Sequence, residues 1–309
     1  MSIASSILAL LVLAHQTPPA SPPATPAPAP QSSPAPATVD EILAALEKAG
    51  EGLKDFQGNI VYESYDAFSE ETQRRYGSLV LDGVGPSRRF AFVFDRLETM
   101  TRDPDGTERV DPDESRDHWV YADGWLTEIN SKQKSVIKRQ IAEEGKPIDP
   151  LKLGEGPFPL PIGQARAAVL EQFDATTCEL PALPLFKSVK DVNGLKLVPK
   201  PGTRMAEDYV EVQLFYVRAD TALRCMHLKE KNGNSITVLL AKPKLNGGLS
   251  AEQRALLEQP DLSKPEWDPK VWAVDVHRLG AAPPAPAPGQ SPPAAKPAAP
   301  ATGVDPTKK

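Results

Sequence analysis

The sequence has few of the residue types from which catalytic and metal centres are built. It contains two cysteines and four histidines among 309 residues, and no two histidines lie at a spacing that suits metal binding. A phosphate-binding loop, a dinucleotide fingerprint and a nucleophile elbow are all missing. No pair of carboxylates stands out as a general acid and base. We therefore expect no catalytic residue, no metal and no cofactor, and predict that the protein is not an enzyme.

The chain also lacks an excess of positive charge. Residues 39–280 hold 32 of the 35 Lys and Arg residues and 40 of the 41 Asp and Glu residues, which gives this part a net charge of −8. No stripe of Lys and Arg with interleaved aromatic residues is present. Because binding to nucleic acid or to an anionic membrane surface depends on basic patches, we expect neither partner.

No apolar run is long enough to span a bilayer, so we predict a protein that is not integral to a membrane. The run from Ile3 to Leu13 leads into Val12-Leu13-Ala14, a pattern typical of signal-peptide cleavage. Residues 1–14 are therefore expected to be a signal peptide, although no Lys or Arg precedes the run. This predicts a periplasmic or secreted protein of the cell envelope. No cysteine follows the run, so lipid anchoring of the chain itself is not expected.

Two segments near the ends of the chain consist largely of proline and alanine. Residues 15–38 and 281–309 together hold 18 of the 34 prolines. Such segments bury too little apolar surface to offset the entropy of ordering them, so we expect a disordered linker and a disordered tail. Residues 39–280 are expected to form one domain.

Alternating apolar residues and short turn signals dominate this domain. The turn signals are Asp105-Gly106, Asp123-Gly124, Ser131-Lys132-Gln133-Lys134, Asn193-Gly194 and Asn232-Gly233. Asn-Gly and Asp-Gly supply the positive φ angles that tight hairpins need. We therefore predict an α+β fold that is mainly antiparallel β, with a sheet of about ten strands.

Two helices are expected beside the sheet. Thr38 and Glu41 form a capping-box pattern ahead of apolar residues that recur at helical spacing up to Leu53. A second helix is predicted over Gln164–Phe173. The stretch Gly154–Gly163 is apolar, yet its prolines block both a helix and strand pairing. We expect this stretch to dock against another part of the protein.

A row of phenylalanines indicates where a ligand could bind. Phe90, Phe92 and Phe94 lie on one face of a predicted strand. Simple core packing would also explain such a row. However, two helices and an apolar loop cover a sheet of ten strands only incompletely. A curved sheet covered in this way leaves an apolar cavity of the kind that takes a lipid or an acyl chain.

The two cysteines, Cys178 and Cys225, allow two interpretations. In an exported protein they could form a disulfide, which would stabilise the fold by about 4 kcal/mol in the loop-entropy model. Alternatively, they are unpaired and pack as small apolar residues.

Several short motifs follow one another in a recognisable order. They are Leu53-Lys54-Asp55-Phe56-Gln57-Gly58, Gly77-Ser78-Leu79, Pro86-Ser87-Arg88-Arg89-Phe90, Asp123-Gly124-Trp125-Leu126, Val212-Gln213-Leu214-Phe215, Leu223-Arg224-Cys225-Met226 and Asn232-Gly233-Asn234-Ser235-Ile236. In this order they resemble the periplasmic outer-membrane lipoprotein carrier family, the LolA-like proteins, and its lipid-binding relatives. The likeness covers most of Val39 to Leu240.

The resemblance implies a half-open, curved sheet or half-barrel covered by a small helical lid, with acyl chains bound between the two. The ligand-binding residues that it implies are Phe90, Phe92, Trp119, Leu126, Val212 and Leu214. The lid residues that it implies are Ile42, Leu46, Phe158, Leu160 and Ile162. An arginine latches the lid in the family; here the matching offset falls on Phe90, so the latch role passes to Arg89. A register error of one residue would invert the list of inward-facing residues.

These observations predict an exported, monomeric, non-enzymatic carrier that shields the acyl chains of a lipoprotein or another lipid. Two alternatives stay open. One is a structural or interaction protein of the envelope that acts through its Pro/Ala tails. The other is a lipid-sensing regulator of the same fold, which would need an envelope protein as partner. The tails and the apolar stretch Gly154–Gly163 are not typical of the carriers.

Overall fold

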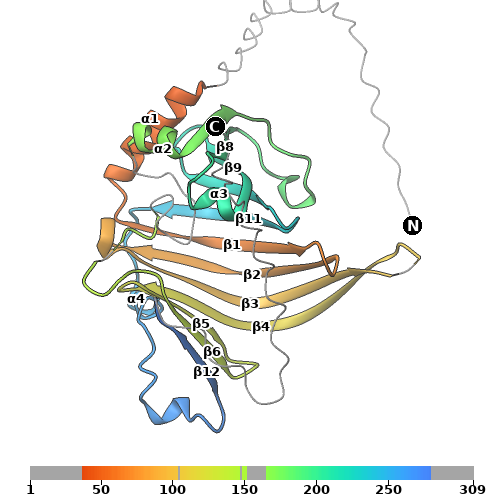
Figure 1. Ribbon diagram of the computed structural model, residues 1–309, viewed down its shortest axis with the longest axis vertical. Coiled ribbons are helices and arrows are strands. Elements are labelled where there is room, and N and C mark those ends of the chain that lie inside the picture. The colour runs from red at the N-terminus through yellow and green to blue at the C-terminus, as the bar shows by residue number, and fades with distance from the viewer. Residues whose placement is uncertain (1–36, 104, 147, 152–164, 280–309) are drawn as a thin grey trace, which may run out of the picture. The chain divides into compact units, whose positions relative to one another are not determined.

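The computed structural model describes residues 37–103, 105–146, 148–151 and 165–279 (Figure 1). The helices are α1 (Val39–Glu51), α2 (Arg166–Gln172), α3 (Met205–Asp208) and α4 (Ala251–Ala255). The strands are β1 (Asp55–Asp66), β2 (Glu71–Asp82), β3 (Arg89–Arg102), β4 (Glu108–Ala122), β5 (Trp125–Asn130), β6 (Ser135–Gln140), β7 (Phe173–Thr177), β8 (Val192–Pro199), β9 (Tyr209–Val217), β10 (Leu223–Glu230), β11 (Ser235–Leu245) and β12 (Ala273–His277). The predicted signal peptide, the stretch Gly154–Gly163 and nearly all of both tails lie outside the described residues.

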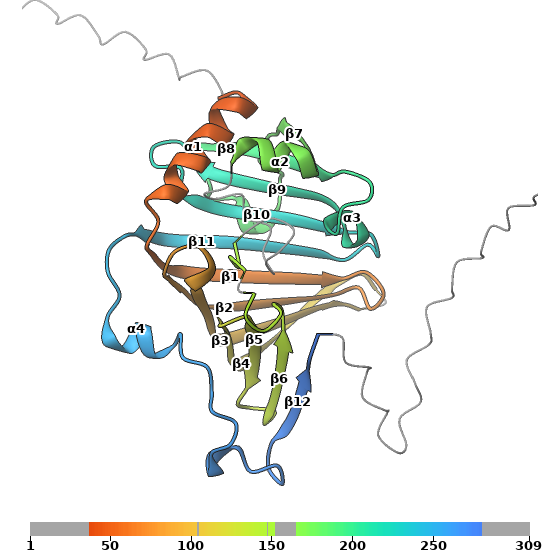
Figure 2. The same ribbon diagram turned by 60° about the vertical axis from the view of Figure 1, so that its left-hand side comes forward.

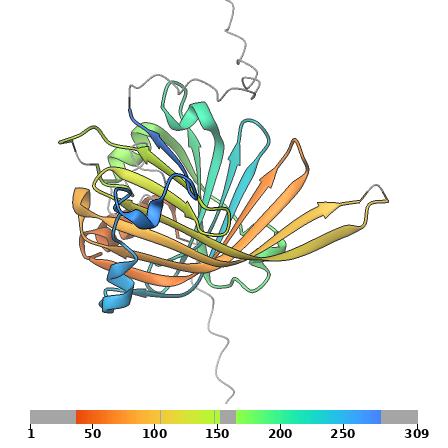
Figure 3. The same ribbon diagram turned by 90° about the horizontal axis from the view of Figure 1, so that it is seen from below.

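The twelve strands form one sheet in the order β12-β6-β5-β4-β3-β2-β1-β11-β10-β9-β8-β7. Neighbouring strands are antiparallel, except that β12 runs parallel to β6. The two outermost strands, β12 and β7, do not pair with each other, so the sheet is open, and Figures 2 and 3 show that it curves. The prediction of a mainly antiparallel, curved and unclosed sheet is confirmed, with twelve described strands in place of about ten.

Four of the five predicted turns are present. Gly106, Gly124, Lys134 and Gly233 all have positive φ angles between paired strands, as tight hairpins require. The fifth prediction is wrong, because Asn193-Gly194 lies inside β8. A Cβ atom at Gly194 would lie 2.2 Å from the carbonyl oxygen of Cys178 and 2.8 Å from the Phe215 ring. This glycine therefore permits close packing and does not form a turn.

Helix α1 begins with the capping box that the sequence predicts. The Thr38 amide donates to Glu41 Oε2 at 2.7 Å, and the Glu41 amide donates to Thr38 Oγ1 at 3.3 Å. Helix α2 confirms the second predicted helix over a shorter range and lies beside α1 (Figure 2), where Arg166 pairs with Asp40 at 2.6 Å. No helix in the described part of the chain is both long and apolar enough to span a membrane.

Alternation along the strands gives the sheet two apolar faces. We call the face that carries Phe90, Phe92 and Phe94 the inner face. It bears the largest apolar cluster, and α1 contributes Ile42 and Leu46 to the same cluster. Because α1 contacts β7 and β8, it covers the inner face at that end of the sheet. The inner face is thus the one on which an apolar ligand could be enclosed.

Part of the outer face is covered by the segment between β11 and β12, which contains the short helix α4. Residues 246–272, which we call the outer strap, run from β11 to β12 across β1 to β5. Leu249 and Leu257 of the strap pack on Val80, Ala91 and Val120. Gln259 of the strap donates to the carbonyl oxygen of Trp125 at 2.9 Å. The strap therefore covers this half of the outer face with its own small core.

The cysteines are both free and lie on the outer face with Phe186 and Phe215. Cys178 continues β7, since its amide donates to the Gly194 carbonyl at 3.1 Å. Gly194 is opposite Phe215, which in turn is opposite Cys225. Three strand spacings therefore separate the two cysteines, about 14 Å, whereas a disulfide needs Cα atoms about 4.4–6.8 Å apart. The possible disulfide is thus corrected to two free thiols.

Candidate functional site

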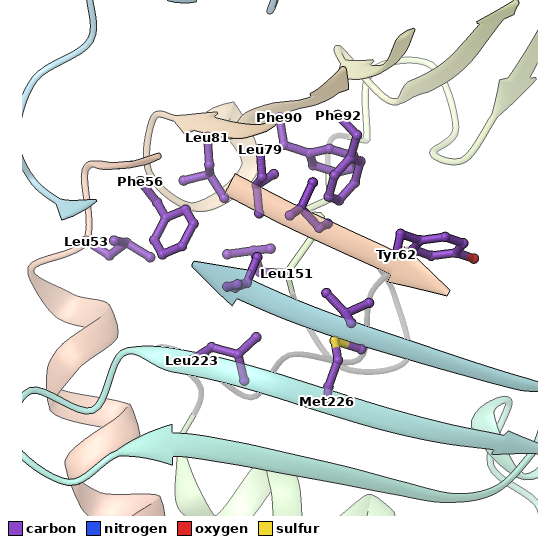
Figure 4. Close-up of a pocket in the computed structure, with 13 residues that line it drawn as sticks. Leu53, Phe56, Tyr62, Leu79, Leu81, Phe90, Phe92, Leu151, Leu223 and Met226 are labelled. Atoms are coloured by element: carbon purple, nitrogen blue, oxygen red, sulfur yellow. The ribbon is translucent and has the colours of Figure 1, made fainter. Parts of the chain in front are cut away.

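An apolar pocket lies on the inner face, where β3, β2 and β1 meet β11 and β10 (Figure 4). Thirteen residues line it: Leu53, Phe56, Ile60, Tyr62, Leu79, Leu81, Phe90, Phe92, Leu151, Leu223, Met226, Val238 and Leu240. Eleven of them come from strands. Leu53 follows α1, and Leu151 lies between β6 and α2 in the sequence. Among these side chains only that of Tyr62 carries an oxygen or nitrogen atom.

Strand register explains why distant parts of the sequence meet in this pocket. Phe56 is opposite both Leu81 and Leu245, and Leu81 is opposite Phe90. On the other side of β1, Tyr62 is opposite Val238, which is opposite Met226. Every second residue points to the same face, so five adjacent strands present a continuous apolar surface.

The pocket is narrow for its extent. The cavity volume is only about 70 Å³, so the lining side chains stand close together. From Phe56 to Tyr62 the floor is six residues long, which is about 20 Å for an extended strand. A long and slender space without polar partners disfavours water and suits a hydrocarbon chain.

A cluster of aromatic rings continues the inner face beyond the pocket. The Tyr62 and Trp119 ring centroids are 5.4 Å apart with nearly perpendicular planes, and those of Phe94 and Trp119 are 5.2 Å apart. Phe92 and Phe94 are stacked at 6.1 Å. Edge-to-face pairs of this kind fix the positions of large rings. The cluster therefore gives this side of the pocket a rigid wall.

All six ligand-binding residues predicted from the sequence lie in or against the inner-face cluster. Phe90 and Phe92 line the pocket. Trp119 and Leu126 pack beside it on β4 and β5, at the sheet half that leads to β12. Val212 and Leu214 are fully buried on β9 and do not line the pocket. Trp119 and Leu126 therefore lie on one side of the pocket that Phe90 and Phe92 line, and Val212 and Leu214 lie on the other side.

The predicted lid residues divide into two groups. Ile42 and Leu46 on α1 are buried against the inner-face cluster but do not line the pocket. Phe158, Leu160 and Ile162 lie outside the described residues. The residue that connects α1 to the pocket is Leu53, which comes two residues after the helix ends and is buried in the lining.

The predicted latch residue requires a correction. Arg89 alternates with Phe90 and therefore points to the outer face, where it pairs with Asp82 at 3.2 Å and with Glu258 at 3.1 Å. It makes no contact with α1 in the described part of the chain. Arg88 instead is buried and donates from Nη1 to Asp149 Oδ2 at 2.6 Å. Asp149 Oδ1 also accepts from the Leu151 amide at 3.0 Å, so this arginine is connected to a lining residue.

Sequence reasoning missed the contribution of β10 and β11 to the pocket. The strands Leu223–Glu230 and Ser235–Leu240 are evident from their alternation, but alternation does not reveal which strand lies beside which. The pairing of β1 with β11, about 180 residues apart in sequence, brings Val238 and Leu240 to Ile60 and Tyr62. The alternation in β11 indicated that Val238 and Leu240 lie on one face of a strand. It did not indicate that this strand pairs with β1.

Tyr62 is the one ionisable residue of the pocket lining. Burial raises the pKa of Tyr62 to about 12, although the positive charge of Arg75 opposes this shift. His118 and His227 lie on the outer face, and burial lowers the pKa of each below its ordinary value. The described residues contain no group of three or more His, Cys, Asp or Glu side chains placed to hold a metal ion. The pocket lining therefore offers apolar packing and a single phenol.

Comparison with known proteins gives matches among solved structures only. No family model matches the chain, and no curated protein does. An uncharacterized conserved protein of Thermus thermophilus is 12% identical over 77% of this chain and 98% of that chain, with a TM-score of 0.37. A proposed outer membrane lipoprotein-sorting protein domain of Vibrio parahaemolyticus is 15% identical over 71% and 97%, with a TM-score of 0.28.

A LolA superfamily protein of Nitrosomonas europaea is 12% identical over 70% of this chain and 96% of that chain, with a TM-score of 0.25. The resemblance to LolA-like proteins, inferred from short sequence motifs, is thus found again among solved structures.

Proposed function

We propose that this protein is a non-enzymatic carrier that binds an acyl chain of a lipid or a lipoprotein in the inner-face pocket. One observation carries the proposal: thirteen side chains enclose the pocket, and the Tyr62 hydroxyl is their only polar group. A polar substrate would find almost no partner there, and its desolvation would go uncompensated. A hydrocarbon chain has no such cost.

The binding free energy would come from removing the chain from water. Each buried methylene contributes about 0.8 kcal/mol, so ten of them contribute about 8 kcal/mol. Association costs of several kcal/mol oppose this gain. Chains of roughly six carbons would therefore bind too weakly to be carried, whereas chains of about fourteen or more would bind tightly enough.

Entry and release require side chains to move, because little of the pocket is open. Helix α1 is suited to control this movement, since Leu53 follows it directly and Ile42 and Leu46 anchor it to the same cluster. We propose α1 as part of a lid, together with the predicted lid residues Phe158, Leu160 and Ile162. The pair Arg88–Asp149, next to Leu151, takes the latch role first given to Arg89.

The sequence supports a proposal for the location of the protein and for the roles of its tails. We propose residues 39–280 as a lipid-binding domain that is exported to the periplasm or secreted after loss of residues 1–14. The Pro/Ala segments 15–38 and 281–309 would connect this domain to the envelope. Acylated lipoproteins or lipids are the proposed ligands, and an envelope protein would receive or deliver them. A lipid-sensing regulator would use the same pocket and differ in its partner.

The experiment that tests this function is a binding titration with saturated fatty acids of increasing length, followed by native mass spectrometry. We expect occupancy to rise steeply with chain length. A Leu79→Trp variant should lose binding, because the larger side chain fills the pocket from β2. Val210→Trp is the matched control, since Val210 is about half exposed on β9 and lies away from the lining.

Two outcomes would contradict the proposal. One is the absence of binding for every chain length in the unaltered protein. The other is equal loss of binding in both tryptophan variants, because a general disturbance of the sheet and not the pocket would then explain it. Circular dichroism of both variants, expected to match the unaltered protein, separates folding from binding.

A further inference from the structure

The pocket has two chemically different ends. At one end lie Leu53, Phe56 and Leu223, next to the end of α1. At the other end lies Tyr62, whose hydroxyl points away from the other labelled lining residues in Figure 4. This asymmetry would orient an amphiphilic ligand. Its hydrocarbon end would lie toward Leu53 and its polar end would lie beside Tyr62.

Beyond Tyr62 the inner face becomes polar. Arg75 on β2 is directly opposite Tyr62, and Asp117 on β4 is opposite Phe94. Glu230, at the end of β10, is opposite Tyr209. Burial is the main cause of the raised pKa of Tyr62 and of Tyr209, and the negative charge of Glu230 adds to both shifts. We call the group Tyr62, Arg75, Asp117 and Glu230 the polar rim. The apolar pocket thus opens toward hydrogen-bonding groups.

The charges of the polar rim are already paired or negative. Arg75 Nε donates to Asp117 Oδ2 at 3.1 Å, and its Nη2 donates to the side chain of Gln73 at 2.9 Å. Asp117 is buried and also accepts from Ser115 and Asn130, each at 2.7 Å. Glu230 adds a further carboxylate. The rim therefore has no unpaired positive charge to attract an anion, as far as the described residues go.

Hydrogen-bond donors are nevertheless available at the rim. Arg75 Nη1 and the Tyr62 hydroxyl have no hydrogen-bond partner among the residues that the structure describes. Hydroxyl and ester oxygens can accept from these donors, and hydroxyl groups can also donate to Glu230. A carboxylate or phosphate would instead approach the carboxylates of Asp117 and Glu230, and like charges at short range are unfavourable.

We infer that the pocket selects lipids whose polar part is uncharged and rich in hydroxyl or ester oxygen, and that this part is bound at Tyr62 and Arg75. This inference rests on the proposed function, because it needs an acyl chain in the pocket. It adds the head-group class and the orientation of the ligand. Free fatty acids and lysophosphatidic acid would enter the same pocket but bind less tightly.

The test is a competition at pH 7 between three lipids with the same sixteen-carbon chain: monopalmitoylglycerol, palmitate and palmitoyl lysophosphatidic acid. Occupancy is measured by native mass spectrometry at concentrations below micelle formation. We expect monopalmitoylglycerol to be preferred over both anions. Tyr62→Phe should weaken monopalmitoylglycerol about fivefold, as the loss of one hydrogen bond predicts, and leave palmitate nearly unchanged.

A charge variant makes the test independent of Tyr62. Glu230→Gln removes a carboxylate from the rim and should increase the affinity for palmitate, while Glu252→Gln on the exposed α4 should not. Equal or tighter binding of palmitate in the unaltered protein would overturn the head-group inference and leave the carrier function standing. Absence of binding for all three lipids would overturn the carrier function itself.

Discussion

Arg88 is 5% exposed, and its guanidinium is held by Asp149, with Nη1 and Oδ2 2.6 Å apart. Its neighbour Arg89 points to the outer face, is 31% exposed and pairs with Asp82 and Glu258, whose side chains are 29% and 69% exposed. The two arginines are thus adjacent in sequence and differ completely in environment. The contribution of the buried Arg88–Asp149 pair to the free energy of unfolding can therefore be measured against that of the more exposed Arg89–Asp82 pair.

We predict that Asp149→Asn lowers the free energy of unfolding by about 3 kcal/mol, because it leaves the Arg88 charge buried without its counterion. Arg88 Nε already has no hydrogen-bond partner in the described part of the chain, so little else compensates. Asp82→Asn, which removes a partner of Arg89, should cost below about 1 kcal/mol. Urea unfolding followed by tryptophan fluorescence gives both values. Equal losses of unfolding free energy in the two variants would show that the buried pair of Arg88 contributes no more to stability than the exposed pair of Arg89.

A second prediction concerns Gly194 in β8. Gly194→Ala should destabilise the protein by about 2 kcal/mol or more, because the new Cβ would overlap the Cys178 carbonyl and the Phe215 ring. Gly52→Ala is the control: Gly52 has an ordinary φ of −97° and open space around its Cβ position. We expect this control to change thermal stability little. A comparable fall in melting temperature for both variants would contradict the packing argument.

Gly194 also illustrates what local sequence patterns can and cannot predict. Asn193-Gly194 has the composition of a hairpin turn, and the same composition does form turns at Asp123-Gly124 and Asn232-Gly233. The difference lies in the partner strand: β7 passes so close to β8 that only glycine fits. The sequence of β7, Phe173–Thr177, has no alternating pattern from which this strand could be predicted. Such tertiary contacts are absent from local sequence.

The residues of the candidate site could likewise be predicted only in part. Alternation in β3 placed Phe90 and Phe92 on one face, and those two residues line the pocket. The same alternation put Arg89 on the other face, so the latch expectation conflicted with the pattern that located the phenylalanines. Met226 and Leu240 could not be predicted as lining residues, because their position depends on β1 pairing with β11 across most of the chain.

A third prediction concerns acidification. Burial lowers the pKa of His118 and His227 below the ordinary 6.5, so the unfolded chain binds protons more readily than the folded protein. Stability is therefore unaffected above about pH 7 and falls as the pH drops through about 6.5 toward the lowered folded-state values. We expect the melting temperature to decrease between about pH 7.5 and pH 5. Differential scanning calorimetry across this range measures the decrease.

The contribution of His118 can be isolated by substitution. Its Nε2 lies 2.8 Å from the carbonyl oxygen of Leu256 in the outer strap. His118→Gln keeps a donor near this carbonyl but cannot take up a proton, so its melting temperature should fall less on acidification. His277→Gln, on the edge strand β12, is the comparison; it removes a histidine that is not buried and pairs with Asp275 at 2.9 Å, and it should change the melting temperature at pH 7.5 little. If His118→Gln is as sensitive to acid as the unaltered protein, other groups dominate the pH dependence.

The last prediction concerns the cysteines. Burial raises the pKa of Cys178 to about 11 and that of Cys225 to about 12, so both are protonated and weakly nucleophilic at neutral pH. We expect a thiol reagent such as Ellman's reagent to react slowly with the folded protein. In guanidinium without reductant, two thiols per chain should react at once. A count of zero under these conditions would mean that Cys178 and Cys225 are joined, which their separation across β8 and β9 opposes. A single fast thiol before unfolding would instead identify Cys178, the less buried of the two, as accessible in the folded protein.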